Sequence, residues 1–170
     1  MKKNISTAYT STSTSKILEL LQDDLEKLEE WSRLFPPEKL QQPLAKGKRS
    51  FTETLAHLIN VEARTSEAIY RALLENEPLM AEIHPERDWG NLLRFDLLDF
   101  FDLLAYFKLR RQVLLRVLSV LTEDEWSRTI REAGKKRKES IYWLARSLVL
   151  HEGEHLQDIT DKLGQTKKRS

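Results

Sequence analysis

Apolar residues recur at helical spacing in four long stretches of this chain, and that periodicity restricts the fold more than any other feature. In the first stretch the apolar positions follow at intervals of three and four, at Leu18, Leu21, Leu25 and Leu28. Only five glycines and five prolines occur among 170 residues, which disfavours a turn-rich β fold. No stretch of useful length alternates as a strand does. The sequence therefore predicts an all-α fold in one domain, a four-helix bundle.

Capping signals set the expected helix boundaries at about residues 16–33, 50–75, 91–121 and 140–163. Ser50 and Glu53 match a capping box at the start of the second helix, and Gly164 matches a stop signal after the last. A further capping signal at 122–125 predicts a short turn that ends near Ser127. The Ser/Thr-rich start of the chain is expected to fray. We therefore expect a flexible segment over 1–15, a single domain over 16–164 and a tail over 165–170.

The composition excludes several classes of protein. The chain has no cysteine, so disulfides and thiolate ligands are absent, and a transition-metal site must use histidines and carboxylates. Lys plus Arg total 28 against 27 for Asp plus Glu, which is not the balance of a strongly basic nucleic-acid-binding protein. The N-terminus lacks the apolar run of a signal peptide, and the most apolar segment, 92–109, contains five charged residues. We therefore expect a cytoplasmic protein with no membrane span.

The third predicted helix, 91–121, is apolar on two faces. A helix with a single core to cover needs one apolar stripe, so the second face predicts a further contact. A second copy of the chain would cover it, and a central position within the bundle would also explain it. We expect a homodimer through this helix. The polar remainder, which is interpreted as a solvated face rather than a cation site, consists of Asp96, Asp99 and Asp102.

Two histidines of the last predicted helix point most clearly to chemistry. His151 and His155 lie four residues apart, which puts their Cβ atoms about 5–6 Å apart on one helix face. That face carries a predicted core stripe made of Ile141, Leu144, Leu148, His151, His155 and Ile159. An i, i+4 pair of imidazoles is a natural chelate for a transition metal. Two partly exposed histidines at the end of the bundle are the structural alternative.

His57 would supply a third imidazole from the second predicted helix. Three neutral ligands that leave coordination positions open are typical of a catalytic rather than a structural metal site. A single histidine on such a helix face also occurs as an ordinary core residue. With the bundle bringing the helices together, the sequence predicts a metal site at His57, His151 and His155. His84, next to Pro85, is interpreted as a solvated loop residue.

Two other metal motifs overlap residues 151–155, and both are disfavoured. The segment matches the His-Glu-x-x-His pattern of zinc proteases, but the 15 residues after His155 include no His or Glu to supply the third ligand of those enzymes. Glu152 and His155 also form one Glu-x-x-His unit of the di-iron bundles, which require two such units. Thr54 stands three residues before His57, where a second unit would need a glutamate.

Taken together, these segments resemble the DinB-like (DinB/YfiT) superfamily. The resemblance is carried by residues 51–62, which contain His57, and by residues 140–156, which contain His151 and His155. It implies a four-helix bundle of DinB/YfiT type, often a homodimer, with one divalent metal held by those three histidines. Nickel or zinc is the metal it implies first, followed by iron or manganese. Glu62 matches a glutamate that is common after the first ligand, although it lies off the helical face of His57.

The resemblance also implies a class of activity. Members of the family include transferases that use low-molecular-weight thiols, and hydrolases. We therefore expect a metal-dependent enzyme whose three-His site activates a thiol or water, for transfer to a small electrophile or for hydrolysis. Glu152 and Glu154 are the nearest carboxylates, but both point about 100° away from the histidine face, so no catalytic base is predicted.

Two other functions compete with this expectation. The first is a non-catalytic, stress-related dimeric bundle that binds a partner. The second is nucleic-acid binding through the basic run 135–138 and the residues 167–169. That run lies in one predicted loop without interleaved aromatic residues, so we interpret it as a solvated loop and do not expect nucleic acid as a partner.

Overall fold

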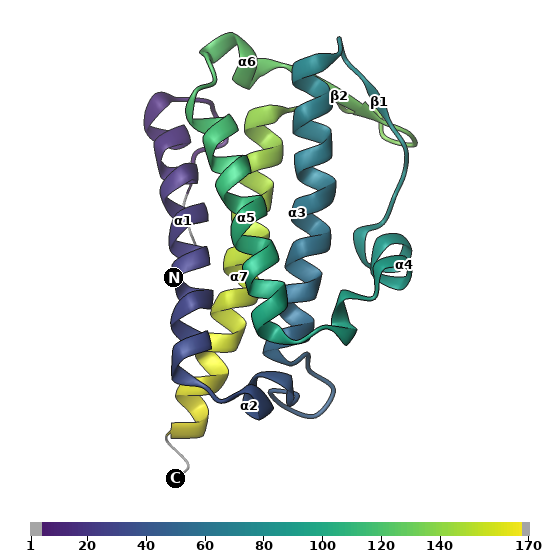
Figure 1. Cartoon of the computed structure of the whole chain (residues 1–170). Coiled ribbons are helices and arrows are strands. Elements are labelled where there is room, and N and C mark those ends of the chain that lie inside the picture. The colour runs from purple at the N-terminus through teal and green to yellow at the C-terminus, as the bar shows by residue number, and fades with distance from the viewer. Residues whose placement is uncertain (1–4, 168–170) are drawn as a thin grey trace.

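The chain forms a bundle of four long helices with shorter elements between them (Figure 1). The computed structural model describes residues 5–167, and the side chains of residues 5–164. The long helices are α1 (Ser11–Leu34), α3 (Phe51–Leu74), α5 (Phe100–Ser119) and α7 (Ile141–Lys167). The shorter ones are α2 (Pro37–Gln41), η1 (Pro85–Gly90), α4 (Asn91–Leu93), η2 (Phe95–Leu97) and α6 (Glu123–Ser127). The prediction of a four-helix bundle is confirmed.

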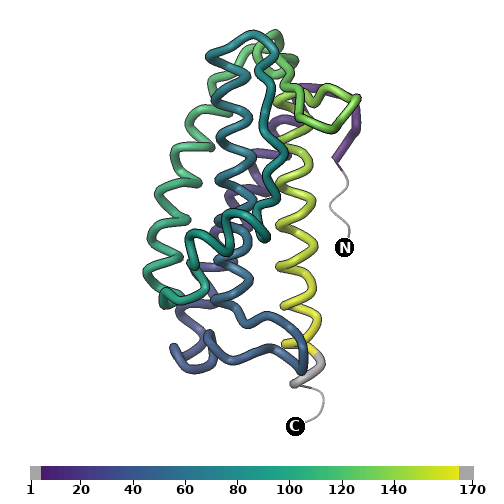
Figure 2. Tube along the Cα trace, turned by 90° about the vertical axis from the view of Figure 1, so that its right-hand side faces the viewer, coloured from purple at the N-terminus to yellow at the C-terminus, as the bar shows by residue number. Residues whose placement is uncertain are grey.

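The first two long helices, α1 and α3, lie diagonally across the bundle from each other, and so do the last two, α5 and α7. Helix α1 packs against α5 and α7, and α3 packs against the same two helices. Figure 1 accordingly shows α1 and α3 at the two sides with α5 in front of α7, and Figure 2 shows α5 and α7 on either side of α3. The two helices that carry the three predicted metal ligands, α3 and α7, are therefore direct neighbours.

The core consists of two apolar clusters stacked along the bundle axis. Each long helix contributes to both clusters, because its apolar residues recur at helical spacing on the inward face. Between its two contributions each helix also carries at least one buried charged residue. These residues are Asp24 on α1, Glu62 and Arg64 on α3, Arg111 on α5 and Glu152 on α7. A layer of charge therefore separates the two apolar clusters.

Helix α1 begins earlier than its periodicity predicts. Its first residue is Ser11, and the Thr10 side chain caps it by accepting a hydrogen bond from the Ser13 amide. The predicted start at Lys16 is therefore wrong. Ile5, before the helix, is only 3% exposed and packs into the core. The flexibility predicted for residues 1–15 stays a prediction, and residues 1–4 lie outside the described part of the chain.

Helix α7 also extends past its predicted end. It continues to Lys167, so Gly164 lies inside the helix and is not its stop signal. Part of the predicted tail, 165–170, is thus helical, and residues 168–170 lie outside the described part of the chain. The capping boxes of Ser50 with Glu53 and of Thr122 with Glu125 are confirmed, because in each the side chain and the backbone bond reciprocally.

The single helix predicted over 91–121 is wrong at its N-terminal end. Arg94 adopts a left-handed conformation with φ of 47°, which ends α4 after one turn. Asp99 then caps α5 by accepting hydrogen bonds from the Phe101 and Asp102 amides. An aspartate that bonds to the backbone in this way favours a helix start over a helix interior. The segment before α5 therefore folds as a loop of short turns against α3.

A small sheet, which the sequence did not predict, closes one end of the bundle. It consists of β1 (Leu79–Met80), β2 (Thr129–Glu132) and β3 (Glu139–Ser140) in that order, with β1 parallel and β3 antiparallel to β2. The strands have two to four residues each, so they are too short for an alternating pattern to reveal them. Within the described residues, none of the helices is both long and apolar enough to cross a membrane.

Candidate metal centre

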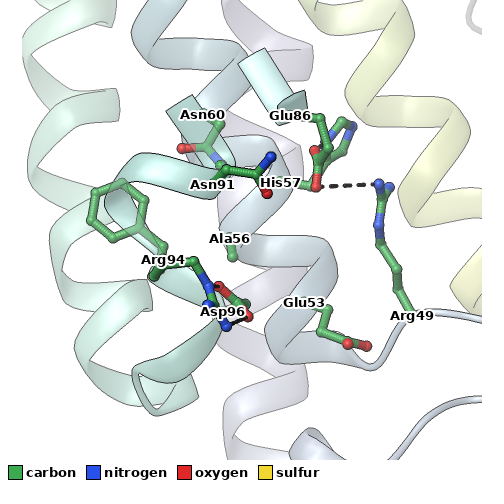
Figure 3. A pocket seen from close by; sticks show the side chains of 11 residues that line it. Arg49, Glu53, Ala56, His57, Asn60, Glu86, Asn91, Arg94 and Asp96 are labelled. Atoms are coloured by element: carbon green, nitrogen blue, oxygen red, sulfur yellow. Dashed lines mark hydrogen bonds and ion pairs between the residues drawn. The ribbon is translucent and has the colours of Figure 1, made fainter. Parts of the chain in front are cut away.

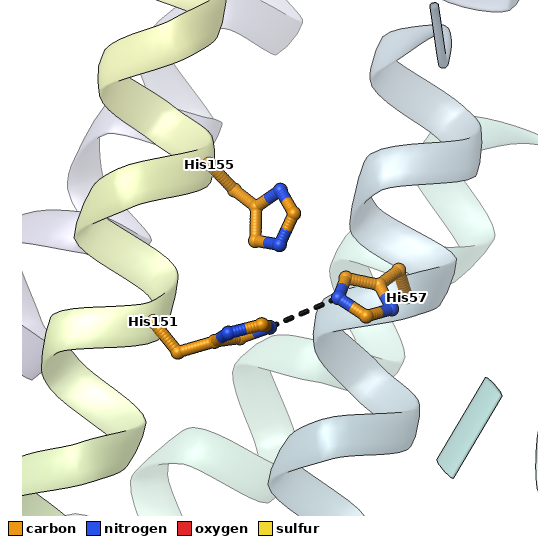
Figure 4. A group of neighbouring side chains, drawn as sticks. All are labelled: His57, His151 and His155. Carbon is orange, nitrogen blue, oxygen red and sulfur yellow. Dashed lines mark hydrogen bonds between the residues drawn. The ribbon is translucent and has the colours of Figure 1, made fainter. Parts of the chain in front are cut away.

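The three predicted ligands meet where α3 packs against α7 (Figure 4). His57 projects from α3, and His151 and His155 project from successive turns of α7. One nitrogen of each ring lies within 4.8 Å of the others, and Nε2 of His57 is 2.9 Å from Nε2 of His151. Figure 4 shows the three rings turned toward a common point. Thus two helices bring together imidazoles, those of His57 and His151, that are 94 residues apart in sequence.

This geometry fits a divalent transition metal. Two nitrogens bound to one metal at about 2.1 Å each lie at most about 4.2 Å apart, so ring movements of less than about 1 Å would bring all three within range. Imidazole nitrogens suit zinc, nickel and iron, and they suit manganese less well because manganese prefers oxygen ligands. The cluster therefore has the donor type and the spacing that a three-His centre needs.

The register of α7 differs from the predicted core stripe in one respect. Glu152 is fully buried and occupies the centre of the inward face, between Leu148 and Leu156. The two histidines lie together on one side of that line, half-buried at the boundary with α3. The predicted stripe is confirmed at Ile141, Leu148 and Ile159, which are buried, but the two histidines lie at its edge. The centre of the face passes through Leu148, Glu152 and Leu156, which follow at i, i+4 spacing.

Glu86 completes the surroundings of His57, and it is not among the residues that the sequence predicts for the site. Its carboxylate accepts a hydrogen bond from Nδ1 of His57, and its other oxygen lies 3.4 Å from Nη2 of Arg49. Glu86 follows Pro85 in η1, a turn capped by the His84 side chain. A carboxylate on one ring nitrogen fixes the tautomer and leaves the other nitrogen free as a metal ligand. Nothing local in the sequence predicts this contact, which spans 29 residues.

The local environment keeps the three imidazoles neutral near pH 7. Burial lowers the pKa of His57, although its hydrogen bond to Glu86 opposes the effect. Burial also lowers the pKa of His151, and the neighbouring His57 adds to the shift. For His155, burial together with the two other imidazoles lowers the pKa to about 4. Because a metal binds the neutral imidazole, these shifts reduce competition from protons.

A central ion cluster, defined here as Glu62, Arg111 and Glu152, lies in the charged layer beside the histidines. Arg111 is fully buried and donates from Nε to Glu62 and from Nη2 to Glu152, each at 2.6 Å. Burial acts against the charged guanidinium, but the two carboxylates hold the pKa of Arg111 above its usual value. Glu62, which matched the family pattern but lay off the ligand face, is thus directed into the core.

Glu152 is held away from the imidazoles by this cluster. Burial raises its pKa to about 7, and the ion pair with Arg111 opposes that rise. In a His-Glu-x-x-His protease, and equally in a di-iron bundle, this glutamate would have to act at the metal. Its contact with Arg111 therefore disagrees with both motifs. Glu154 is exposed, so neither carboxylate takes the place of a catalytic base.

A cavity of about 290 Å³ opens beside His57 (Figure 3). Its walls come from one face of α3, from η1 and from the turns before α5, and they include Ala56, Asn60, Glu86 and Arg94. Asn60 is 2% exposed, and its Oδ1 has no hydrogen-bond partner among the described residues. The volume is at the lower end of the roughly 300–1,000 Å³ of small-molecule sites.

The comparison with known families decides the relationship of the chain. The family model described as the DinB superfamily matches residues 18–159. The chain belongs to the DinB superfamily. That match includes all three histidines of the cluster, so the family resemblance of the sequence is confirmed.

Solved structures show that this DinB superfamily chain shares its fold with known proteins. YfiT from Bacillus subtilis, described as a probable metal-dependent hydrolase with an unusual four-helix bundle topology, superposes with a TM-score of 0.83 at 16% identity. The alignment covers 98% of this chain and 94% of YfiT. The colibactin self-resistance protein ClbS, solved with double-stranded DNA, gives a TM-score of 0.61 at 17% identity, covering 91% and 95% of the two chains. No curated protein matches the chain by sequence.

Proposed function

We propose that this chain is a divalent-metal-dependent enzyme whose three-His centre activates a thiol or water, for transfer to a small electrophile or for hydrolysis. The observation that carries the proposal is the convergence of His57, His151 and His155 from two neighbouring helices. Membership of the DinB superfamily and the description of YfiT as a probable metal-dependent hydrolase support it. Nickel or zinc is the proposed metal, and iron and manganese are further candidates.

The residues of the chain have separate tasks in this proposal. His57, His151 and His155 hold the metal through one ring nitrogen each, and Glu86 orients the His57 ring through the other. A divalent metal bound there supplies a nucleophile near neutral pH, by lowering the pKa of the thiol or water that it binds. We propose that the cavity beside His57, which Asn60 helps to line, receives a small substrate.

An activity assay with simple reagents tests this proposal. Protein loaded with zinc or nickel is given N-acetylcysteine with monochlorobimane to detect thiol transfer, and p-nitrophenyl acetate to detect hydrolysis. We expect one of the two reactions to proceed at least tenfold faster with the parent than with His155→Ala. Ser147→Ala is the matched control, because Ser147 is exposed on the same helix as His155 and lies outside the cluster. Equal rates for parent and His155→Ala in both assays would refute the proposal.

The second candidate function is a non-catalytic dimeric binding module, and exposed apolar residues on α5 favour it. Phe101, Tyr106, Leu109 and Val113 are each more than 40% exposed. We propose that a second copy of the chain covers this surface. Light scattering should find a dimer for the parent and a monomer for Leu109→Glu, with Gln112→Glu, at an exposed polar position, as the control. A monomeric parent would refute the proposal that a second copy of the chain covers this surface.

Nucleic-acid binding gains little support from the basic loop. Lys135 lies near Glu132 and Glu139, Lys138 pairs with Glu77 at 2.5 Å, and Arg137 stacks on Trp143. These cations already have partners within the chain, so the loop is not a free basic patch. The DNA complex of ClbS describes that protein, and we do not propose nucleic acid as a partner of this one.

A further inference from the structure

Arg111 joins all four long helices at one point of the bundle. From α5 its guanidinium reaches Glu62 on α3 and Glu152 on α7, and its Nη1 donates to the Leu21 carbonyl oxygen on α1. All three hydrogen bonds measure 2.6 Å, and the Arg111 side chain is completely buried. Because a guanidinium is planar and its N–H groups point in fixed directions, these contacts fix the helices more strictly than a flexible ammonium would.

The two carboxylates that Arg111 binds stand close in sequence to the metal ligands. Glu152 directly follows His151, and at about 100° per residue both histidines of α7 project to the same side of it, about 60–100° away. Glu62 follows His57 by five residues, which is about 7.5 Å along the axis of α3. Arg111 makes no hydrogen bond to a histidine among the described residues, so it acts on the ligands only through the helices that carry them.

We propose that Arg111 is a positioning residue of the metal centre. Its planar guanidinium holds Glu62 of α3 and Glu152 of α7 at the same time. It thereby fixes how far α3 is shifted along the bundle axis and how it is rotated relative to α7, and the three imidazoles converge only in that arrangement. The inference rests on the proposed function, since it presumes that these imidazoles bind the metal. It adds a residue on a third helix, remote from the histidines, on which the geometry of the centre depends.

A general contribution to stability does not account for this arrangement. Burying three charged groups is costly, and apolar residues of similar size often serve a core equally well or better. Two carboxylate oxygens, Oε1 of Glu62 and Oε2 of Glu152, even lack a hydrogen-bond partner among the described residues. The role of the cluster can therefore be separated from folding. A variant with apolar residues in place of the three charges can be made, and its metal binding can be measured.

The test uses Co²⁺ as a spectroscopic probe of coordination geometry. Arg111→Lys keeps the positive charge but loses the fork, and the triple variant Arg111→Met, Glu62→Leu, Glu152→Leu replaces the cluster with apolar side chains. Leu114→Ala is the control, because it weakens the same helix one turn away, in the apolar cluster that Leu114 shares with Ile69 and Leu148, and leaves the ion cluster unchanged. We expect Co²⁺ affinity to fall about tenfold or more in Arg111→Lys and in the triple variant, with altered visible absorption. Leu114→Ala should keep the parental affinity and spectrum.

Each outcome decides the inference. A folded triple variant, or a folded Arg111→Lys, with the parental affinity and spectrum would overturn it and leave the proposed function intact. If the triple variant does not fold, Arg111→Lys alone decides. If the parent binds no Co²⁺, the proposed function fails, and the imidazole ¹⁵N shifts of the metal-free protein decide the positioning role. Those shifts should change for His57 and His151 in Arg111→Lys and stay parental in Leu114→Ala, and unchanged shifts in Arg111→Lys would refute the positioning role.

Discussion

The Nη2 atom of Arg111 lies 2.6 Å from Oε1 of Glu152, the residue directly after His151. Because of this contact, the glutamate of the His-Glu-x-x-His segment lies in the core and not at the metal site. Both histidines lie on one side of this buried position, on the face of α7 that meets His57 of α3. Motif and structure therefore agree on the histidines and disagree on the glutamate between them.

Removing Arg111 should strongly destabilise the fold. Arg111→Ala would leave Glu62 and Glu152 buried without their shared cation, and breaking a buried pair in this way costs about 3–5 kcal/mol. Urea unfolding followed by circular dichroism measures the loss. Arg116→Ala, at an exposed position on the same helix, should change the free energy of unfolding by less than about 0.5 kcal/mol. Similar small effects for both variants would contradict the burial of the cluster.

Glu86 should tune the affinity of the centre without being a ligand. In Glu86→Gln the amide can still accept a hydrogen bond from His57, but it no longer increases the basicity of the ring. We expect zinc affinity to fall about 10- to 100-fold, which competition with a chromophoric chelator measures. Glu82→Gln, at an exposed position four residues earlier, should bind like the parent. Unchanged affinity in Glu86→Gln would show that the carboxylate does not support His57.

The metal-free protein should lose stability as the pH falls from about 6.5 to about 4. The pKa of His155 is near 4 in the fold and near 6.5 in an unfolded chain, chiefly because of burial. Between these two pH values His155 is protonated in the unfolded state but neutral in the folded state. Because the unfolded state then binds more protons, stability rises with pH. The contribution of His155 to the free energy of unfolding is fully present above pH 6.5 and is lost as the pH falls through 4. Thermal unfolding after removal of metal should show a smaller loss over this window for His155→Phe, and an identical loss would contradict the shift.

Replacing Asn60 should separate stability from ligand binding. Its Oδ1 is buried without a partner among the described residues, and an unpaired buried polar atom costs about 1–3 kcal/mol. Asn60→Leu should therefore unfold at the same or a higher urea concentration than the parent. The same variant should raise the KM of whichever reaction the activity assay detects. A large loss of stability would instead mean that Asn60 supports the fold and does not face a substrate.

The sequence predicts the parts of this molecule that depend on local signals. Apolar spacing predicts four helices, and the capping boxes at Ser50 and Thr122 mark true helix starts. The three-residue spacing of Ser or Thr and Glu is sufficient there, because the bonds form within one turn. His151 and His155 are similarly local, since one helix brings them together. His57 joined them in the prediction only through the expectation that the helices pack as a bundle.

The features that the sequence did not predict depend on contacts between distant segments. The hydrogen bond of Glu86 to His57 and the ion cluster of Arg111 join elements that are 29 to 90 residues apart. A charged residue in an apolar helix is also typical of a surface position. The sequence therefore does not predict that Arg111 is buried. The break before α5 was missed because the apolar residues around Arg94 continue the helical pattern although Asp99 begins a new helix.

The most direct test of the central claim is the metal content of protein purified without a histidine tag, compared with that of His57→Ala. After equilibration with zinc or nickel and removal of unbound ions, elemental analysis should find about one metal per parent chain and almost none in the variant. That result would place a single centre across α3 and α7. A parent without metal, or a His57→Ala variant that keeps a full equivalent, would contradict the three-His centre.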